Sequence, residues 1–201
     1  MRFWRKMRAS DKDVEVLKKY MFKNSNLQSI QVAILSDTHA YLDHRIAEIV
    51  NLADYVVHAG DIGNASVLEK LSPRLEKVIA VRGNNDSEEK WSIDESHIVR
   101  QLPTTAEIDL PGGRLVVEHG EHHGFHAPCH SSLRKAHPDA RVIVYGRTHR
   151  LVCDQSEEPW VVNPGAAGRT RTHGGPSCLL LMANEDEWSL EIRQFTAIAA
   201  A

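Results

Sequence analysis

The segment Val32-Ala-Ile-Leu-Ser-Asp-Thr-His39 sets the pattern on which the rest of the chain is built. An apolar run with β-branched residues predicts a buried strand, and the polar residues Asp37 and His39 follow it directly. Four later apolar runs end in the same way, and they precede Gly60-Asp61, Gly83-Asn84-Asn85-Asp86, His119-Gly120 and Gly146-Arg147-Thr148-His149. Because ligand sites of open α/β sheets collect beyond the carboxyl ends of strands, we expect these side chains at one site.

The spacing of apolar residues predicts an α/β fold. Strands over 31–35, 54–58 and 77–81 alternate with helices near 43–52 and 65–71, which is typical of parallel strands with right-handed crossovers. The second half predicts a hairpin, a helix and further strands, over 107–118, 128–137, 140–145, 161–162, 177–182 and 187–195. The stretch after Asn84 is expected to be irregular. We therefore expect two mixed sheets packed together with helices outside.

Residues 1–29 are expected to form an N-terminal extension, and residues 30–201 the domain proper. Ser10 is a suitable cap for a helix that runs to Phe22. The apolar stripe of Val14, Leu17 and Met21 indicates either packing on the flank of the domain or docking of a partner.

Composition excludes several classes of protein. The chain has 201 residues, and its net charge of −3 with scattered Lys and Arg argues against a surface for extended nucleic acid. We expect no membrane span, because no apolar run approaches the length that a bilayer requires. The three cysteines show no CxxC spacing, and with the lack of a signal core they favour the cytoplasm. The oligomeric state stays open.

The polar residues at the strand ends are suited to divalent cations. Asp37 and His39 are one residue apart and can reach the same cation, and the carboxylate of Asp61 can bridge two. The other donors are an amide and two imidazoles, those of Asn84, His119 and His149. Two cations about 3.5–4 Å apart would hold a nucleophilic hydroxide and a phosphoryl oxygen, which fits phosphate-ester hydrolysis. Mixed oxygen and nitrogen ligands favour Mn²⁺, with Zn²⁺, Fe, Ni²⁺ or Mg²⁺ as alternatives.

Five ordered pieces resemble the D-x-H, G-D, G-N-x-D/E, H-G and G-H-x-H motifs of the calcineurin-like metallophosphoesterases. They are Ser36-Asp-Thr-His39, His58-Ala-Gly-Asp61, Val81-Arg-Gly-Asn-Asn-Asp86, Glu118-His-Gly120 and Tyr145-Gly-Arg-Thr-His149. The chain is most similar to the small single-domain branch, which includes phosphodiesterases and the retromer scaffold subunit. Asn163-Pro-Gly165 resembles the last active-site loop of that branch. The resemblance implies a four-layer αββα sandwich.

The resemblance also implies the roles of individual residues. A first metal would be held by Asp37, His39 and His149 together with Asp61, which bridges to a second metal. That second metal would be held by Asp61, Asn84 and His119. The residues expected to act in catalysis are Asp61, Asn84, His119 and Arg147. Asp86 would orient its neighbours through hydrogen bonds.

Two positions depart from the family pattern. Arg147 stands where the family has a histidine that ligates the second metal, and a guanidinium cannot ligate a cation. Either the second metal is retained but bound more weakly, with Arg147 clamping a substrate phosphate, or the site holds a single metal. Asn85 stands where larger members have a histidine thought to protonate the leaving group, which asparagine cannot do. His122 and His123 are candidates for that acid, or are exposed loop residues.

These observations predict a metal-dependent phosphodiesterase or phosphatase for a small phosphate ester, with the diester favoured. The alternative is a non-catalytic scaffold on the same fold. Retention of His39, His119 and His149 favours the enzyme. A nuclease for long nucleic acids would need a capping domain and a basic stripe, and the sequence indicates neither.

Overall fold

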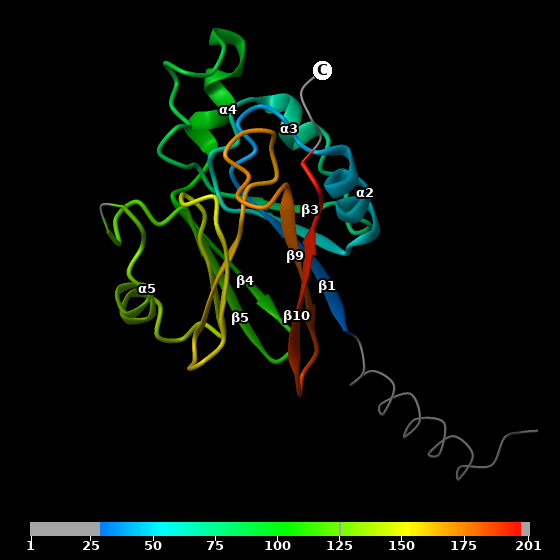
Figure 1. Ribbon diagram of the computed structural model, residues 1–201, viewed down its shortest axis with the longest axis vertical. Helices are drawn as coiled ribbons and strands as arrows, with labels where there is room; N and C mark the ends of the chain where they lie inside the picture. The colour runs from blue at the N-terminus through cyan, green and yellow to red at the C-terminus, as the bar shows by residue number, and fades with distance from the viewer. Residues whose placement is uncertain (1–28, 125, 198–201) are drawn as a thin grey trace, which may run out of the picture.

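The computed structural model describes residues 29–124 and 126–197, and two five-stranded sheets pack face to face in it (Figure 1). The first sheet has the order β10 (Trp188–Gln194), β9 (Ser177–Ala183), β1 (Ile30–Leu35), β2 (Tyr55–His58) and β3 (Lys77–Ala80). The second has the order β4 (Thr105–Leu110), β5 (Gly113–Glu118), β6 (Val142–Val144), β8 (Trp160–Pro164) and β7 (Leu151–Asp154).

Parallel pairing at the centre of each sheet places the expected site loops side by side. In the first sheet β1, β2 and β3 are parallel, and Leu35 lies opposite His58. The loops that follow β1 and β2 therefore begin side by side at the same edge of the sheet. In the second sheet β5, β6 and β8 are parallel, and Val117 lies opposite Val144. The loop that carries His119 and the loop that contains Gly146 therefore begin next to each other at the edge of the second sheet.

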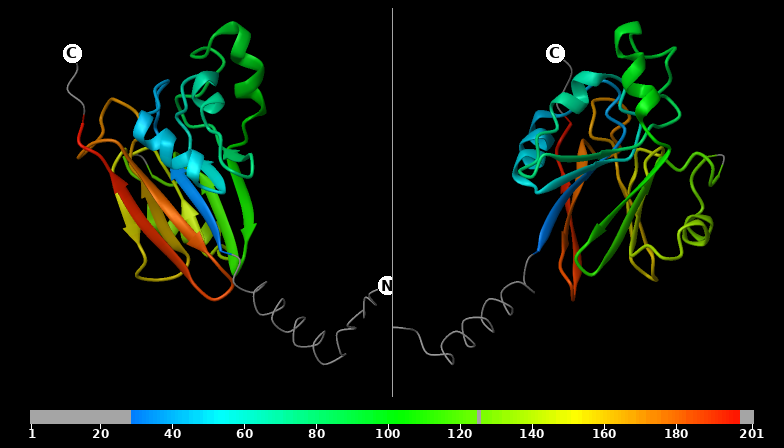
Figure 2. Two further views of the ribbon diagram at one scale, coloured as in Figure 1. Left: turned by 90° about the vertical axis from the view of Figure 1, so that its right-hand side faces the viewer. Right: turned by 180° about the vertical axis from the view of Figure 1, so that it is seen from behind.

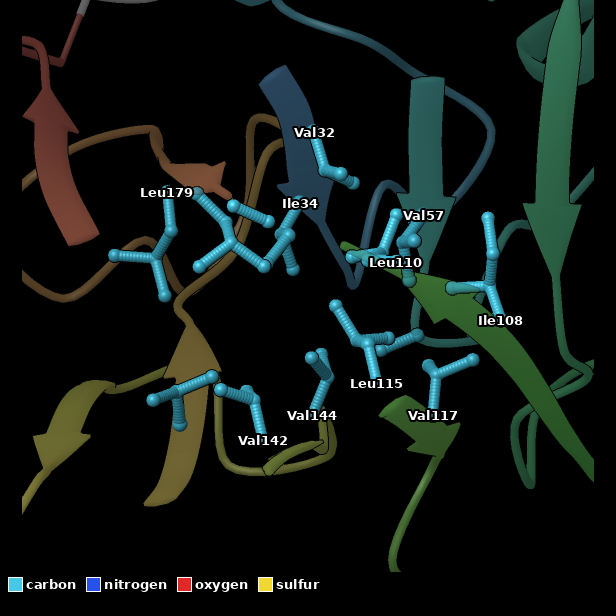
Figure 3. Close-up of a cluster of buried hydrophobic side chains, with 14 of the residues drawn as sticks. Val32, Ile34, Val57, Ile108, Leu110, Leu115, Val117, Val142, Val144 and Leu179 are labelled. Carbon is cyan, nitrogen blue, oxygen red and sulfur yellow. The ribbon is translucent and has the colours of Figure 1, made fainter. Parts of the chain in front are cut away.

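The core lies between the two sheets (Figure 3). Val32, Ile34 and Val57 of the first sheet face Leu115 and Val144 of the second, and all five are fully buried. Full burial of each such side chain contributes about 1.5–3 kcal/mol. This packing fixes the two sheets, and hence the two sets of loops, relative to each other.

Helices cover the outer faces and complete the expected αββα layers (Figures 1 and 2). On the first sheet, α2 (His44–Leu52) buries Ile46 and Val50 against the outer face. The side chains of β1 and β2 on that face alternate along each strand with those that face the second sheet. Short helix α3 (Ala65–Glu69) follows β2. On the second sheet, α5 (His130–Ala136) buries Leu133. The predicted α/β sandwich is confirmed.

The structure adds elements that the sequence pattern did not predict. The stretch expected to be irregular holds a 3-10 turn, η1 (Ile93–Glu95), and α4 (Ser96–Gln101), whose Val99 packs with Trp91 and Val67. Strand β7 pairs antiparallel with β8. Helix α3 ends at Glu69, two residues earlier than expected. The helix predicted for the N-terminal extension lies outside the described residues.

Within residues 29–124 and 126–197, no helix combines the length and apolar character that a bilayer crossing requires. The three cysteines are unpaired: Cys129 is exposed, Cys153 is partly buried and Cys178 is buried.

Candidate metal centre

The predicted ligands lie on loops that follow β1, β2, β3, β5 and β6. Several of these residues have a left-handed backbone, with φ of 53° at Asp37, 44° at His39, 54° at Asp61, 68° at Arg147 and 57° at His149. Left-handed conformations of non-glycine residues cost about 1–3 kcal/mol each and persist only where the surrounding structure imposes them. Here backbone hydrogen bonds link the first two loops, from the Asp37 N–H to the Gly60 carbonyl and from the His39 N–H to the Asp61 carbonyl, both at 3.0 Å.

Four side chains converge on one point of this edge. The Nε2 atoms of His39 and His149 are 3.1 Å apart, and His149 Nε2 lies 3.2 Å from Asp37 Oδ1. His39 Nε2 lies 3.6 Å from Asp61 Oδ2. One donor atom from each of the four residues lies within 4.8 Å of the others. Two carboxylates and two imidazoles in such a group form a ligand set for a divalent cation.

The buried carboxylate of Asp37 tests whether this set fits a cation. Asp37 is fully buried, and among the described residues neither of its oxygens accepts a hydrogen bond. Buried carboxylates are normally paired or bound to a metal, because an unpaired buried charge is costly. Burial raises the pKa of Asp37 from 3.8 to about 7, and His119 offsets this only in part. A cation beside Asp37 would give the carboxylate a partner and lower this pKa again, so the residues fit the metal implied by the sequence.

His119 is oriented toward the same centre from the second sheet. Its Nδ1 donates to the Ala59 carbonyl at 2.7 Å, because a carbonyl can only accept, and this leaves the lone pair on Nε2. Nε2 is buried, lacks a hydrogen-bond partner among the described residues, and lies 3.5 Å from Asp61 Oδ1. Burial lowers the pKa of His119, but Asp61 and Asp37 more than offset this and raise it to about 9. The carboxylates thus draw positive charge to Nε2, where a metal ion could take the place of the proton.

Asp61 lies between these two sets of donors. One of its oxygens faces His39 and the other faces His119. Burial raises the pKa of Asp61, but its contacts with His119 and Asn85 more than offset this and hold it well below the usual range. Asp61 is therefore ionised, as a bridging ligand must be.

Arg147 contacts the amide that was expected to complete the second metal site. Its Nη1 donates to Asn84 Oδ1 at 3.0 Å. Asn84 is exposed, and its amide oxygen is engaged by the positive charge of Arg147. The structure brings Asp61 and His119 of the predicted second set together, and Asn84, the third member, is in contact with a guanidinium.

Asn85 and Asp86 support the centre from the loop after β3. Asn85 donates twice to Asp61, from its backbone N–H to Oδ1 at 2.8 Å and from Nδ2 to Oδ2 at 2.7 Å. Lys90 Nζ donates to Asn85 Oδ1 at 2.7 Å and so fixes the orientation of the amide. Asn85 is a positioning residue for Asp61.

The Asp86 carboxylate ties two loops together. It accepts hydrogen bonds from the backbone N–H groups of Ile62 at 3.0 Å and of Gly63 and Gly83 at 2.9 Å. The indole N–H of Trp91 donates to it at 3.2 Å. Asp86 thus forms the hydrogen bonds that an orienting role requires, and that role stays a prediction.

Glycine is required where the loops approach most closely. A Cβ on Gly83 would overlap the Asp61 carboxylate, and one on Gly146 would overlap Ser36 Oγ and lie 2.9 Å from His119 Nδ1. Asn163 holds the Gly146 loop, since its Nδ2 donates to the Gly146 carbonyl at 2.6 Å. The Gly83 and Gly146 positions of the motifs are thus explained by steric contact.

His58 precedes Gly60-Asp61 but has a structural role. The Gly60 N–H donates to His58 Nδ1 at 3.2 Å, so Nε2 carries the proton and faces Thr38 Oγ1 at 3.0 Å. Burial lowers the pKa of His58 to about 3, so the ring is neutral. Its hydrogen bonds join the β1 loop to the β2 loop.

Sequence reasoning did not identify Arg171 as part of the site. Its Nη2 donates to His39 Nε2 at 3.0 Å. Burial and the nearby Arg171 lower the pKa of His149 to about 4, so that ring is neutral and suited to ligation. The available signal was the pair Arg169 and Arg171 in the glycine-containing loop that follows Asn163-Pro-Gly165.

His122 and His123 are engaged elsewhere. The His122 side chain is 80% exposed and lies 3.9 Å from Glu121. In His123, Nε2 lies 3.0 Å from Glu118 Oε1 and Nδ1 lies 2.8 Å from Ser132 Oγ. Both ring nitrogens of His123 are therefore occupied, and its predicted role as an acid stays a prediction.

Comparisons with known proteins agree with this fold. The family model of the calcineurin-like phosphoesterase superfamily domain matches residues 30–186. The chain is 28% identical over 146 residues to phosphodiesterase MJ0936 of Methanocaldococcus jannaschii, covering 68% of this chain and 83% of that protein. It is 30% identical over 176 residues to phosphodiesterase YfcE of Escherichia coli, covering 78% of this chain and 89% of that protein.

A solved structure gives the same fold. Vps29 of Entamoeba histolytica, crystallised with Zn²⁺, superposes with a TM-score of 0.62 at 18% identity, covering 83% of this chain and 98% of that chain. The family match, the two phosphodiesterase relatives and the ligand set lead to one conclusion. The chain belongs to the calcineurin-like phosphoesterase superfamily, as a metal-dependent phosphoesterase of its small single-domain branch.

Proposed function

We propose that this protein hydrolyses a small phosphate diester at the centre formed by Asp37, His39, Asp61 and His149, with Mn²⁺ as the preferred metal. The observation that carries this proposal is the buried Asp37 carboxylate, which lacks a hydrogen-bond donor among the described residues and faces His149. The names of the relatives MJ0936 and YfcE, both phosphodiesterases, support the choice of a diester. The three unpaired cysteines support a reducing compartment, such as the cytoplasm.

A divalent cation bound at this centre would supply Lewis acidity, which lowers the pKa of the attacking water and neutralises charge on the phosphate. Asp37, His39 and His149 would hold the tighter ion, and Asp61 would share an ion on its other side with His119. The His119 tautomer is set by the Ala59 carbonyl, so its Nε2 is aimed at this second position without rearrangement.

Two arginines at the edge of the centre would bind the phosphate. Arg147 contacts Asn84, and Arg171 contacts His39, so both guanidinium groups lie beside proposed ligands. A guanidinium presents N–H groups in a planar fork that matches two phosphate oxygens. We assign Arg147 and Arg171 to substrate binding. For Arg147, this role takes the place of the metal-binding role that the family resemblance implies for a histidine there.

Asn85 would supply no proton to the leaving group. Asn85 donates its amide to Asp61 and cannot transfer a proton near neutral pH. The proposed enzyme is therefore best suited to substrates whose leaving group is already a weak base.

The test compares bis-p-nitrophenyl phosphate with p-nitrophenyl phosphate, using protein stripped with chelator and then reloaded with Mn²⁺, Zn²⁺ or Ni²⁺. We expect hydrolysis that returns with metal, with a higher kcat/KM for the diester. Asp61→Ala should abolish it, whereas Asp109→Asn, a change of an exposed carboxylate on β4, should not. Faster hydrolysis of the monoester would overturn the diester assignment and leave a phosphatase.

The second candidate is a non-catalytic scaffold, and the contact between Arg147 and Asn84 is the observation that favours it. Under that hypothesis the guanidinium has displaced the second metal, and with it the activity. A folded, metal-loaded protein without hydrolysis of either ester would support this candidate.

A further inference from the structure

A second cluster of metal-binding side chains lies outside the Asp37 and Asp61 centre. It consists of Glu118, His123 and His137, named here the Glu118 cluster. Oε1 of Glu118 lies 3.0 Å from His123 Nε2, and Oε2 lies 2.8 Å from His137 Nε2. One donor atom of each residue lies within 4.8 Å of the other two. Each oxygen of one carboxylate thus faces a different imidazole.

The three residues come from separate parts of the chain. Glu118 is the last residue of β5, His123 lies in the loop beyond it, and His137 caps the C-terminus of α5. Their side chains are 10%, 12% and 18% exposed, respectively. The cluster is therefore largely shielded from bulk solvent.

A neighbouring hydroxyl orients one of the rings. Nδ1 of His123 lies 2.8 Å from Ser132 Oγ on α5, which leaves Nε2 directed at Glu118. Metal-ligating histidines have this arrangement, because a hydrogen bond at the second ring nitrogen fixes the ring and raises the basicity of the ligating one.

We infer that the Glu118 cluster is a second metal site, for a cation of the Zn²⁺ class. Zn²⁺ binds imidazole nitrogens and carboxylate oxygens at about 2.0–2.2 Å, so its tetrahedral ligand atoms lie about 3.3 Å apart. The observed separations of 3.0 and 2.8 Å run to different oxygens of Glu118, and one donor atom of each residue lies within 4.8 Å of the others, so the side chains must adjust for one ion to be held by all three. One carboxylate and two neutral imidazoles suit a divalent ion, and three protein ligands leave one position for water.

The position of the cluster indicates what an ion would do there. Helix α5 has seven residues, and Leu133 is its buried anchor on the second sheet. A short helix with so little buried surface gains most of its stability from tertiary contacts. Zinc held jointly by Glu118 and His137 would fasten the end of α5 to β5. The site is structural, and the inference is independent of the proposed diesterase activity.

The experiment measures zinc bound per chain and its position. Metal-stripped wild type, His137→Gln and His97→Gln are dialysed against the same buffered Zn²⁺ and analysed by atomic emission. His97 is an exposed histidine on α4 and serves as the matched control. We expect wild type and His97→Gln to retain about one more equivalent than His137→Gln, and to lose more thermal stability than His137→Gln when chelator is added.

Anomalous diffraction at the zinc edge, from wild-type crystals soaked in Zn²⁺, removes any dependence on the folding of the variant. A peak between Glu118, His123 and His137 is the expected result. A zinc-loaded Asp37 centre with no peak at the Glu118 cluster, or equal zinc in all three proteins, would overturn the inference. The cluster would then be a hydrogen-bonded ion pair only.

Discussion

At the scale of single residues, Arg147 makes the two halves of the metal centre unequal. In the proposed centre, Asp37, His39 and His149 lie together with Asp61, whereas near His119 a guanidinium stands where the family resemblance implies an imidazole. Arg147 both removes a ligand and places a positive charge next to Asn84. Each change weakens binding of a cation in that half.

Replacing Arg147 tests this asymmetry. Arg147→His should tighten binding of the second Mn²⁺ by about tenfold or more, because it restores an imidazole and removes the charge. Isothermal titration of stripped protein should show two unequal affinities in wild type and two closer ones in the variant. Identical second affinities in the two proteins would contradict the role given to Arg147.

Asp37 should make the stability of the metal-free protein depend on pH. The folded-state pKa of this carboxyl is about 7, against 3.8 for the unfolded chain. A raised pKa contributes stability that is complete below pH 4 and is lost as the pH rises through 7. In chelator, Asp37→Asn should therefore gain in melting temperature relative to wild type as the pH rises from 4.5 to 7.5.

The size and direction of that effect can be checked by thermal denaturation. The gain corresponds to about 2–4 kcal/mol at most, or several degrees for a chain of this length. In excess Mn²⁺ the order should reverse, because only wild type keeps the carboxylate ligand. A constant difference between the two proteins across this pH range would contradict burial as the cause.

At the scale of elements, the site depends on loops held together by side chains of their neighbours. Asp86 joins the loop after β2 to the loop after β3, and Asn163 and His58 make similar links. These contacts hold left-handed residues such as Asp61 in place. The strain of the ligand loops is thus supported by hydrogen bonds from the surrounding structure.

Asp86→Asn should measure how much one such link contributes. An amide cannot accept all four hydrogen bonds, and leaving a buried N–H unpaired costs about 1–3 kcal/mol. We expect a lower melting temperature together with weaker Mn²⁺ binding, since Asp61 loses its support. Asp94→Asn, at an exposed position on η1, is the matched control and should change neither. A stable Asp86→Asn protein with unchanged metal affinity would show that the link is dispensable.

At the scale of the whole molecule, most of the fold followed from periodicity. The buried strands that precede Asp37, Asp61 and His119 are short apolar runs with polar ends, and such runs determine both the strand and the position of its loop. The convergence of Asp37, His39, Asp61 and His149 was predictable for the same reason, because each lies in a loop that follows a strand.

The parts that were not predictable lack a periodic signal. Helix α4 buries one residue fully, Val99, so it has no apolar stripe, and the four residues of β7 are all only partly buried. Arg171 lies in an irregular loop, and its contact with His39 spans 132 positions. The Glu118 cluster likewise depends on how α5 packs against β5, which no local pattern encodes.

The central claim is metal-dependent hydrolysis at the Asp37 and Asp61 centre. It is tested most directly by following bis-p-nitrophenyl phosphate hydrolysis while stripped wild type and Asp61→Asn are titrated with Mn²⁺. We predict that the rate of wild type rises with bound Mn²⁺, and that the folded variant stays at least about 100-fold slower. Hydrolysis that is equal in the two proteins, or a Mn²⁺-loaded wild type with none, would contradict the account.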